Sequence, residues 1–179
     1  MKGLDGISQV DKAFGREDEW FKNKPNVGPI NLGIDLVAEE QHELMLELYG
    51  LDGYSVEEDR TVKLDYTPIN VLKTAKEMAD VIVVIQNLAK RLGIDLSIAL
   101  DLVNNSNLTK LCSDPEKALI YGKIKYPDRQ IGIKKLDNGA YMLYDIETGK
   151  FLKGYGYQEP NMAPACKVPS IDLKENVET

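Results

Sequence analysis

Two long segments of the chain repeat apolar residues at helical spacing, and they constrain the fold more than any other feature. Residues 31–49 carry this pattern and are followed by Gly50, a common helix stop signal. Residues 70–92 carry it again and end at Gly93. Two consecutive helices of this length predict a helical core in which the pair packs together.

Shorter patterns predict the remaining elements. An apolar pattern near the N-terminus indicates a short helix before a loop rich in proline and glycine, and residues 96–105 indicate another helix. Asp114 followed by Pro115 is typical of a helix start. Residues 130–153 alternate apolar and polar side chains around two turns, which predicts a β-hairpin or a small meander. We expect the tail from residue 160 to wrap loosely or to be disordered.

These patterns divide the chain into three parts. Residues 1–30 form an N-terminal helix and loop, residues 31–125 a helical core, and residues 126–179 a β-rich extension with the tail. The length of 179 residues suits one domain with a small appendage. We therefore expect an all-α fold with a small C-terminal β-hairpin extension.

The charge of the chain restricts its partners. It has 29 acidic and 22 basic residues, a formal net charge of −7. No segment concentrates the Lys and Arg needed to bind a nucleic acid by its phosphates.

The longest apolar run, residues 81–85, is far shorter than the roughly 18 residues that cross a bilayer, and the N-terminus lacks a signal-peptide core. We expect a cytoplasmic protein that binds neither nucleic acid nor membrane.

Acidic residues gather on one face of each long helix. On the first helix, four of them fall within an arc of about 100°: Glu39, Glu40, Glu43 and Glu47. On the second helix, Glu77 and Asp80 share their stripe with Val84, a residue expected to face the core. Carboxylates on such a stripe are costly without a positive partner. We therefore expect a positively charged side chain or a cation next to these carboxylates.

Two kinds of partner fit this requirement. Antiparallel packing of the helices would bring Glu40, Glu43, Glu77 and Asp80 together as an all-oxygen cage. Hard cations such as Mg²⁺ or Mn²⁺ prefer that ligand set. A salt-bridge network with Lys or Arg is the alternative. A di-iron bundle would need two Glu-x-x-His pairs, and His42 is the only histidine in the chain.

The acidic motifs resemble a known family signature. Residues 39–43, Glu-Glu-Gln-His-Glu, and 77–80, Glu-Met-Ala-Asp, resemble the Glu-Glu-x-x-Glu and Glu-x-x-Asp motifs of the all-α nucleoside triphosphate pyrophosphohydrolases. Residues 106–111, Ser-Asn-Leu-Thr-Lys-Leu, are similar to an element of the MazG-like and phosphoribosyl-ATP pyrophosphohydrolase-like members. Residues 149–154 with Tyr157 resemble their Gly-Lys-Val-Leu-Lys-Gly-Pro-Asn-Tyr segment. The matches occur in the family's order, and together they are more specific than any one motif.

The resemblance implies a metal centre. It assigns two to three Mg²⁺ or Mn²⁺ ions to the four carboxylates already named: Glu40, Glu43, Glu77 and Asp80. It leaves Glu39 to orient or deprotonate water, with Glu43 as the other candidate for that role. One departure from the family is the gap between the acidic motifs, which is longer than we expect. The excess falls in a predicted loop at residues 50–68.

The resemblance also implies contacts with the substrate phosphates. Asn104, Asn107 and Lys110 follow one another at about one-turn intervals near the end of the third helix and could hold phosphates that metal does not bind. An ordinary helix C-terminus, where lysine favours the dipole and asparagine caps, is the alternative. Lys153 and Tyr157 are further candidates, although Lys153 could equally mark the end of the hairpin.

The family reaction converts a nucleoside triphosphate and water to the monophosphate and pyrophosphate. We expect deoxynucleotides, dGTP among them, as substrates in pool sanitation or precursor supply. Trp20 is available to stack on the base or to pack in the core. The resemblance further implies a homodimer or homotetramer. A non-catalytic helical protein that binds a nucleotide or a protein partner is the alternative function.

Overall fold

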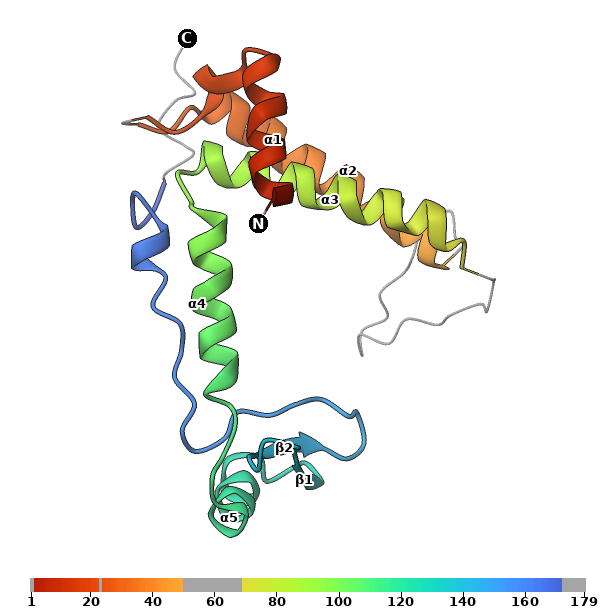
Figure 1. The fold of residues 1–179 in the computed structure, drawn as a ribbon, viewed down its shortest axis with the longest axis vertical. Helices are drawn as coiled ribbons and strands as arrows, with labels where there is room; N and C mark the ends of the chain where they lie inside the picture. The colour runs from red at the N-terminus through yellow and green to blue at the C-terminus, as the bar shows by residue number, and fades with distance from the viewer. Residues whose placement is uncertain (1, 23, 50–68, 172–179) are drawn as a thin grey trace. The chain divides into compact units, whose positions relative to one another are not determined.

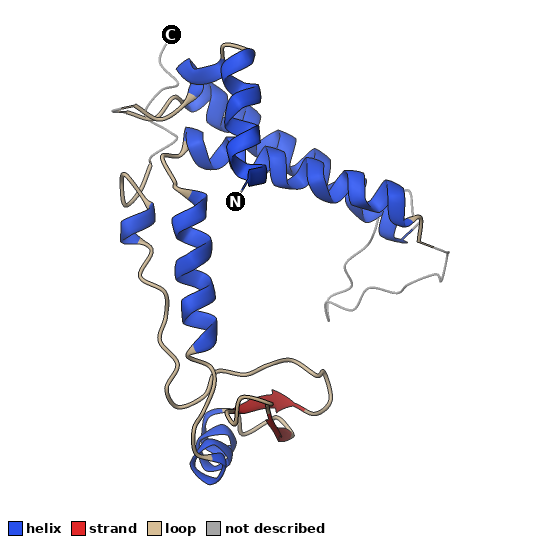
Figure 2. Cartoon of the chain, viewed as in Figure 1, coloured by secondary structure: helices blue, strands red, loops and turns tan. Residues whose placement is uncertain are grey.

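The computed structural model describes residues 2–22, 24–49 and 69–171 of the chain. Over these residues the chain is mostly helical, with five α-helices and one antiparallel sheet of two strands (Figure 2). The prediction of a helical chain with a C-terminal hairpin is confirmed at this level. The predicted loop at residues 50–68 lies outside the described residues. Within the described ranges, no helix combines the length and the apolar character that crossing a bilayer requires.

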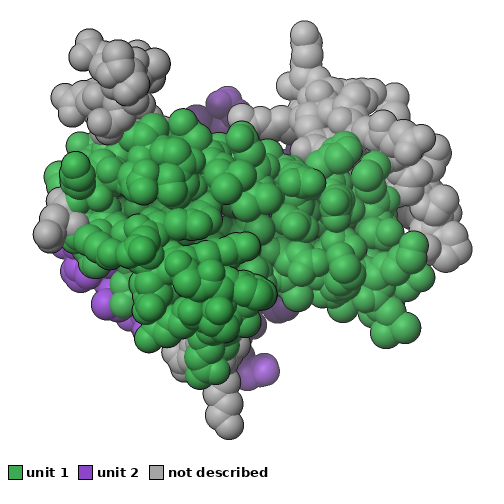
Figure 3. Space-filling view, turned by 90° about the horizontal axis from the view of Figure 1, so that it is seen from above, with its two compact units in different colours: residues 1–96, 166–179 green, residues 97–165 purple. Residues whose placement is uncertain are grey.

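The chain divides into two compact units (Figure 3). Unit 1 consists of residues 1–96 and 166–179, and unit 2 consists of residues 97–165. This division differs from the predicted grouping, which joined residues 31–125 into one helical core. Sequence patterns follow chain order, whereas a compact unit is defined by contacts between distant segments. The functional core over residues 31–125 stays a prediction.

Unit 1 contains α1 (Lys2–Ala13), the short 3₁₀ helix η1 (Arg16–Glu19), α2 (Val27–Tyr49) and α3 (Val71–Arg91). α2 begins earlier than its predicted start at residue 31. Pro29 lies in its first turn, where a proline costs no helical hydrogen bond because the first amide groups have no partner within the helix. The proline that indicated a loop in the sequence therefore belongs to the helix start.

α3 has the boundaries that the sequence predicts, within one residue at each end. The Asn70 side chain accepts a hydrogen bond from the backbone amide of Lys73 at 3.2 Å and caps the N-terminus. At the other end, Gly93 adopts a φ of 71°, the left-handed conformation that ends many helices. A Cβ at Gly93 would lie 2.9 Å from the ring of Phe21. Gly93 thus ends α3 and also lets the Phe21 ring pack against the backbone at this point.

α2 and α3 lie side by side in opposite directions (Figure 1). Contacts along the pair follow one antiparallel register: Glu47 with Lys73, Glu43 with Glu77, and Gly33 with Leu88. A Cβ at Gly33 would lie 3.1 Å from Leu88 Cδ1, so this glycine lets the two helices approach closely. The antiparallel packing that brings the acidic stripes of the two helices together is therefore present.

Two basic residues in the last turn of α3 hold the N-terminal segment. Lys90 Nζ forms an ion pair with Asp11 Oδ2 at 2.8 Å, and both side chains are largely shielded from solvent. Arg91 is buried, pairs with Glu19, and donates a hydrogen bond to the Pro29 carbonyl at 2.9 Å. A buried charge requires such partners. The start of the chain is thus attached to α3 by polar contacts.

The segment just after residue 165 is held more closely than the predicted loose tail, and the part of that prediction that falls on residues 172–179 lies outside the described residues. Cys166 forms an isolated antiparallel bridge with Ile94, and the Lys167 amide donates to the Gly93 carbonyl at 3.0 Å. Lys167 Nζ also donates to the Phe21 carbonyl at 3.2 Å. Prolines in the sequence indicated a segment without regular structure, but they do not prevent isolated backbone contacts. Residues 166–167 are therefore part of the packing of unit 1.

Unit 2 contains α4 (Leu96–Leu108), which starts at the boundary, followed by α5 (Pro115–Lys125), β1 (Ile131–Lys135) and β2 (Tyr141–Asp145). Asp114 caps α5 as predicted, accepting from the amides of residues 116 and 117. The strands pair with Ile133 opposite Leu143, and Gly139 in the turn has a φ of 82°. The core under the hairpin is formed by four buried side chains: Cys112, Ala118, Leu143 and Leu152.

Candidate metal centre

Three of the four predicted metal ligands meet where α2 packs against α3. One oxygen of each of Glu40, Glu43 and Glu77 lies within 4.8 Å of the other two. Glu77 is only 8% exposed, Glu40 is half-buried, and Glu43 is exposed. The cluster is thus anchored against the helix pair at Glu77 and open to solvent at Glu43.

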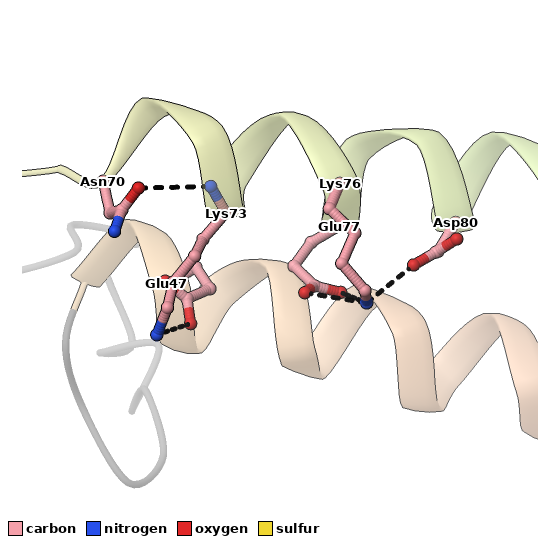
Figure 4. A network of polar contacts seen from close by, with 6 residues as sticks. All are labelled: Glu47, Asn70, Lys73, Lys76, Glu77 and Asp80. Carbon is pink, nitrogen blue, oxygen red and sulfur yellow. Dashed lines mark hydrogen bonds and ion pairs between the residues drawn. The ribbon is translucent and has the colours of Figure 1, made fainter.

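Lys76 connects the fourth predicted ligand to the cluster (Figure 4). Its ammonium lies 3.0 and 3.2 Å from the two carboxylate oxygens of Glu77 and 2.8 Å from Asp80 Oδ2. The hydrogen bond to Asp80, followed by that to Glu77, holds the pKa of Lys76 above its usual value. Sequence reasoning named no lysine here, although the i, i+4 spacing of Lys76 and Asp80 was a usable signal.

The pKa of Glu40 is raised by its position among other carboxylates. Burial raises the pKa of its carboxyl group, and the charges of Glu43 and Asp80 raise it further. Lys76 acts in the opposite direction but does not reverse the shift. Over the described residues, the cluster therefore holds more negative charge than Lys76 neutralises, and it favours uptake of a proton or a cation.

The carboxylates fit a divalent metal by chemistry and by spacing. Octahedral Mg²⁺ with oxygens at about 2.1 Å places its ligand atoms roughly 3 to 4 Å apart. The oxygens of Glu40, Glu43 and Glu77 lie within 4.8 Å of one another, so small side-chain adjustments suffice. Carboxylate oxygens without sulfur or nitrogen suit Mg²⁺ and Mn²⁺. Each of the three carboxylates and Asp80 could contribute ligands.

Other residues of the α2 stripe take different positions. Glu39 and His42 are exposed. Glu47 pairs with Lys73 at 3.4 Å, so it belongs to a separate ion pair rather than to the cluster (Figure 4). The predicted roles of Glu39 and Glu43 in activating water stay predictions.

In unit 2, the structure brings together the two segments predicted to hold phosphate. Ser106 Oγ donates to the Gln158 carbonyl at 2.6 Å, and the Gln158 amide donates to Thr109 Oγ1 at 2.9 Å. A Cβ at Gly154 would lie 2.7 Å from the Lys110 carbonyl oxygen, so the chain passes close to the end of α4 there. The residues around Lys110 therefore pack directly against residues 154–158.

Lys153 and Tyr157 both contact Glu159, a residue that sequence reasoning missed. Lys153 pairs with one carboxylate oxygen of Glu159, and the Tyr157 hydroxyl donates to the other at 2.9 Å. Lys153 Nζ also lies 4.3 Å from the centre of the Tyr157 ring. The bonds from Lys153 and Tyr157, with the charge of Lys110, lower the pKa of Glu159. No sequence pattern joined Glu159 to these residues.

The remaining predicted contacts are distributed between the units. Asn104 and Asn107 are exposed on α4 in unit 2. Trp20 lies in unit 1 with Lys90 Nζ 4.7 Å from its ring centre. Lys90 follows Glu77 by about 20 Å along α3, at 1.5 Å per residue. The carboxylates and Trp20 thus belong to one unit, and the predicted phosphate contacts to the other.

Comparisons with known proteins provide one relative. The chain is 28% identical over 123 residues to the uncharacterized protein L479 of Acanthamoeba polyphaga mimivirus. The match covers 65% of this chain and 45% of that protein, so the chain spans less than half the length of this relative. No protein-family model and no solved structure matches the chain.

Proposed function

We propose that the protein is a metal-dependent nucleoside triphosphate pyrophosphohydrolase with a MazG-like helical core. The observation that carries the proposal is the meeting of Glu40, Glu43 and Glu77 across an antiparallel helix pair. These are three of the four positions that the family resemblance assigns to metal. The raised pKa of Glu40 supports it further, because such a cluster gains from a bound cation.

The proposed chemistry assigns a separate task to each part of the site. Glu40, Glu43, Glu77 and Asp80 hold two to three Mg²⁺ or Mn²⁺ ions. Bound metal would neutralise the charge that develops on the triphosphate and lower the pKa of a coordinated water. Glu39 accepts the proton of the attacking water, with Glu43 as the other candidate. An acidic protein can thereby bind a highly anionic substrate.

The residues that the family resemblance assigns to the substrate phosphates lie in unit 2, and we propose them as phosphate contacts of that unit. Lys110 and Lys153 supply positive charge, and Asn104, Asn107 and Tyr157 supply hydrogen bonds for phosphate oxygens. We further propose a deoxynucleoside triphosphate as substrate, dGTP among the candidates, and a cytoplasmic site of action. Trp20 stays a candidate for stacking on the base.

Exposed apolar residues on α3 support a homodimer or homotetramer. Val71 is 73% exposed and Leu72 is 86% exposed, and Met78 and Ile82 on the same helix are also exposed. Large apolar side chains exposed along one helix favour burial against another surface. A second copy of the chain would cover them, as the family resemblance implies.

Incubation of the protein with each triphosphate and Mg²⁺ or Mn²⁺ tests the proposal directly. We expect release of pyrophosphate rather than of single phosphates. The matched variant Glu39→Gln should retain Mn²⁺ binding and lose turnover by about 100-fold or more, because a positioned base contributes about that factor. Nucleotide binding without any release would instead indicate the non-catalytic alternative, and unchanged turnover in the variant would exclude Glu39 as the base.

A further inference from the structure

Lys76 occupies the oxygens that a divalent cation would need. Its ammonium contacts both carboxylate oxygens of Glu77 and one oxygen of Asp80, at 2.8 to 3.2 Å. We infer that Lys76 is a built-in counter-cation that the metal displaces, and that it thereby sets the metal concentration at which the centre fills. This inference rests on the proposed metal site and concerns its regulation.

Burial of Glu77 explains why the cluster keeps a positive charge of its own. The Glu77 side chain is only 10% exposed, and a shielded carboxylate without a partner is strongly destabilising. Lys76 provides that partner from the neighbouring position on α3 and joins it to Asp80 one turn further along. The centre can therefore stay folded before any metal binds.

The Lys76 ammonium and a metal ion would compete for the carboxylate oxygens of Glu77 and Asp80. A metal bonded to Glu77 at about 2.1 Å would lie within a few ångströms of an ammonium bonded to the same carboxylate, and like charges at that distance repel. The Lys76 side chain is 65% exposed and long enough to turn into solvent. Exchange of the ammonium for a metal therefore needs no backbone movement.

Lys73 offers a matched control on the same helix, one turn away. Its side chain is also 65% exposed, and its ammonium also forms an ion pair with a carboxylate. Its partner is Glu47, which lies outside the cluster (Figure 4). Removal of either lysine subtracts one positive charge from α3, but only Lys76 contacts the proposed ligands.

The first experiment measures Mn²⁺ binding to the full chain by calorimetry or by electron paramagnetic resonance. We expect Lys76→Met to bind Mn²⁺ about three- to tenfold more tightly than the wild type, because no ammonium has to leave. Lys73→Met should bind it as the wild type does. Methionine suits an exposed helical position. Lys76→Met leaves Glu77 without its ammonium and should unfold more easily than Lys73→Met, so binding is measured after circular dichroism has shown that each variant is folded.

A second experiment uses the wild-type protein alone. Amine-reactive labelling followed by mass spectrometry should show that Mn²⁺ increases the labelling of Lys76 and leaves that of Lys73 unchanged. Equal Mn²⁺ affinity of the wild type and Lys76→Met, or labelling of Lys76 that does not respond to Mn²⁺, would overturn the inference and leave the metal site standing. Failure of all three proteins to bind Mn²⁺ would overturn both.

Discussion

Two polar clusters of this chain are built from the same residue types and have opposite charge. In unit 1, among the residues that the structure describes, Lys76 is the positive group next to Glu40, Glu43, Glu77 and Asp80. Four carboxylates and one ammonium leave three negative charges there. In unit 2, Lys153 pairs with Glu159 and the charge of Lys110 also acts on that carboxylate, so these three described residues together carry one positive charge. The first cluster favours a cation and the second an anion.

This difference indicates which kind of change should matter in each cluster. In the acidic cluster, the proposed ligand is a metal, so removal of one carboxylate removes a direct bond. In the basic cluster, Glu159 occupies the groups that a phosphate would use, so its removal should strengthen binding. Opposite signs of effect for two Glu→Gln changes would therefore support the comparison.

The largest effect is expected for Glu77→Gln in the acidic cluster. Glu77 is the most buried proposed ligand, and an amide cannot replace a carboxylate as an anionic donor. Since metal stabilises the transition state by several kcal/mol, we expect pyrophosphate release to fall by about 100-fold or more, with Mn²⁺ binding weakened in parallel.

Glu47→Gln is the control for this change. Glu47 lies on the same stripe of α2 but pairs with Lys73 outside the cluster. We expect its activity and Mn²⁺ affinity to stay close to those of the wild type. A loss as large as that of Glu77→Gln would mean that the stripe as a whole, rather than the cluster, carries the function.

An intermediate effect is expected for Gly154→Ala, which acts on the support of the basic cluster. The new Cβ would overlap Cys112 Sγ and lie 2.7 Å from the Lys110 carbonyl oxygen. Cys112 is buried, so the neighbours have little room to move. We expect a loss of about 1–3 kcal/mol in the free energy of unfolding, measured by urea denaturation, as for other overpacked sites.

Gly156→Ala tests the same segment without the overlap. The nearest atom to its Cβ position is the Thr109 carbonyl oxygen at 3.9 Å, an ordinary contact. Its unfolding free energy should match the wild type or rise slightly, because alanine restricts the unfolded chain. Equal losses in both variants would show that flexibility of the segment, rather than close packing on α4, is what matters.

The smallest effect is expected for Glu159→Gln. Loss of the carboxylate frees Lys153 and Tyr157, so inorganic triphosphate should bind about two- to fivefold more tightly, the range for exposed ion pairs. Glu147→Gln, an exposed change elsewhere in unit 2, should have no effect on this affinity. Weaker binding in Glu159→Gln would instead mean that Glu159 positions Lys153 for the ligand.

The two clusters also differ in how far they could be predicted. Glu40, Glu43 and Glu77 lie on regular helices, where position in the sequence determines the face of a side chain, and the antiparallel packing needed to join them was the natural arrangement. Lys76 was missed although its i, i+4 spacing to Asp80 indicates a contact, because its second contact, with the adjacent Glu77, does not follow from helical spacing. Glu159 was missed because it lies in a segment with no helical or strand period to place its side chain.

By itself, the sequence determined the main helices, the cap at Asp114, the stop at Gly93, the hairpin, and which carboxylates share a face. These are local properties, set by backbone geometry over a few residues. The tertiary structure decided that α4 belongs to a different compact unit from α2 and α3, that residues 166–167 return to Gly93, and that Lys76 and Glu159 enter the two clusters. Each of these depends on how side chains meet in space, because a local pattern states which face a residue takes but not what lies opposite it.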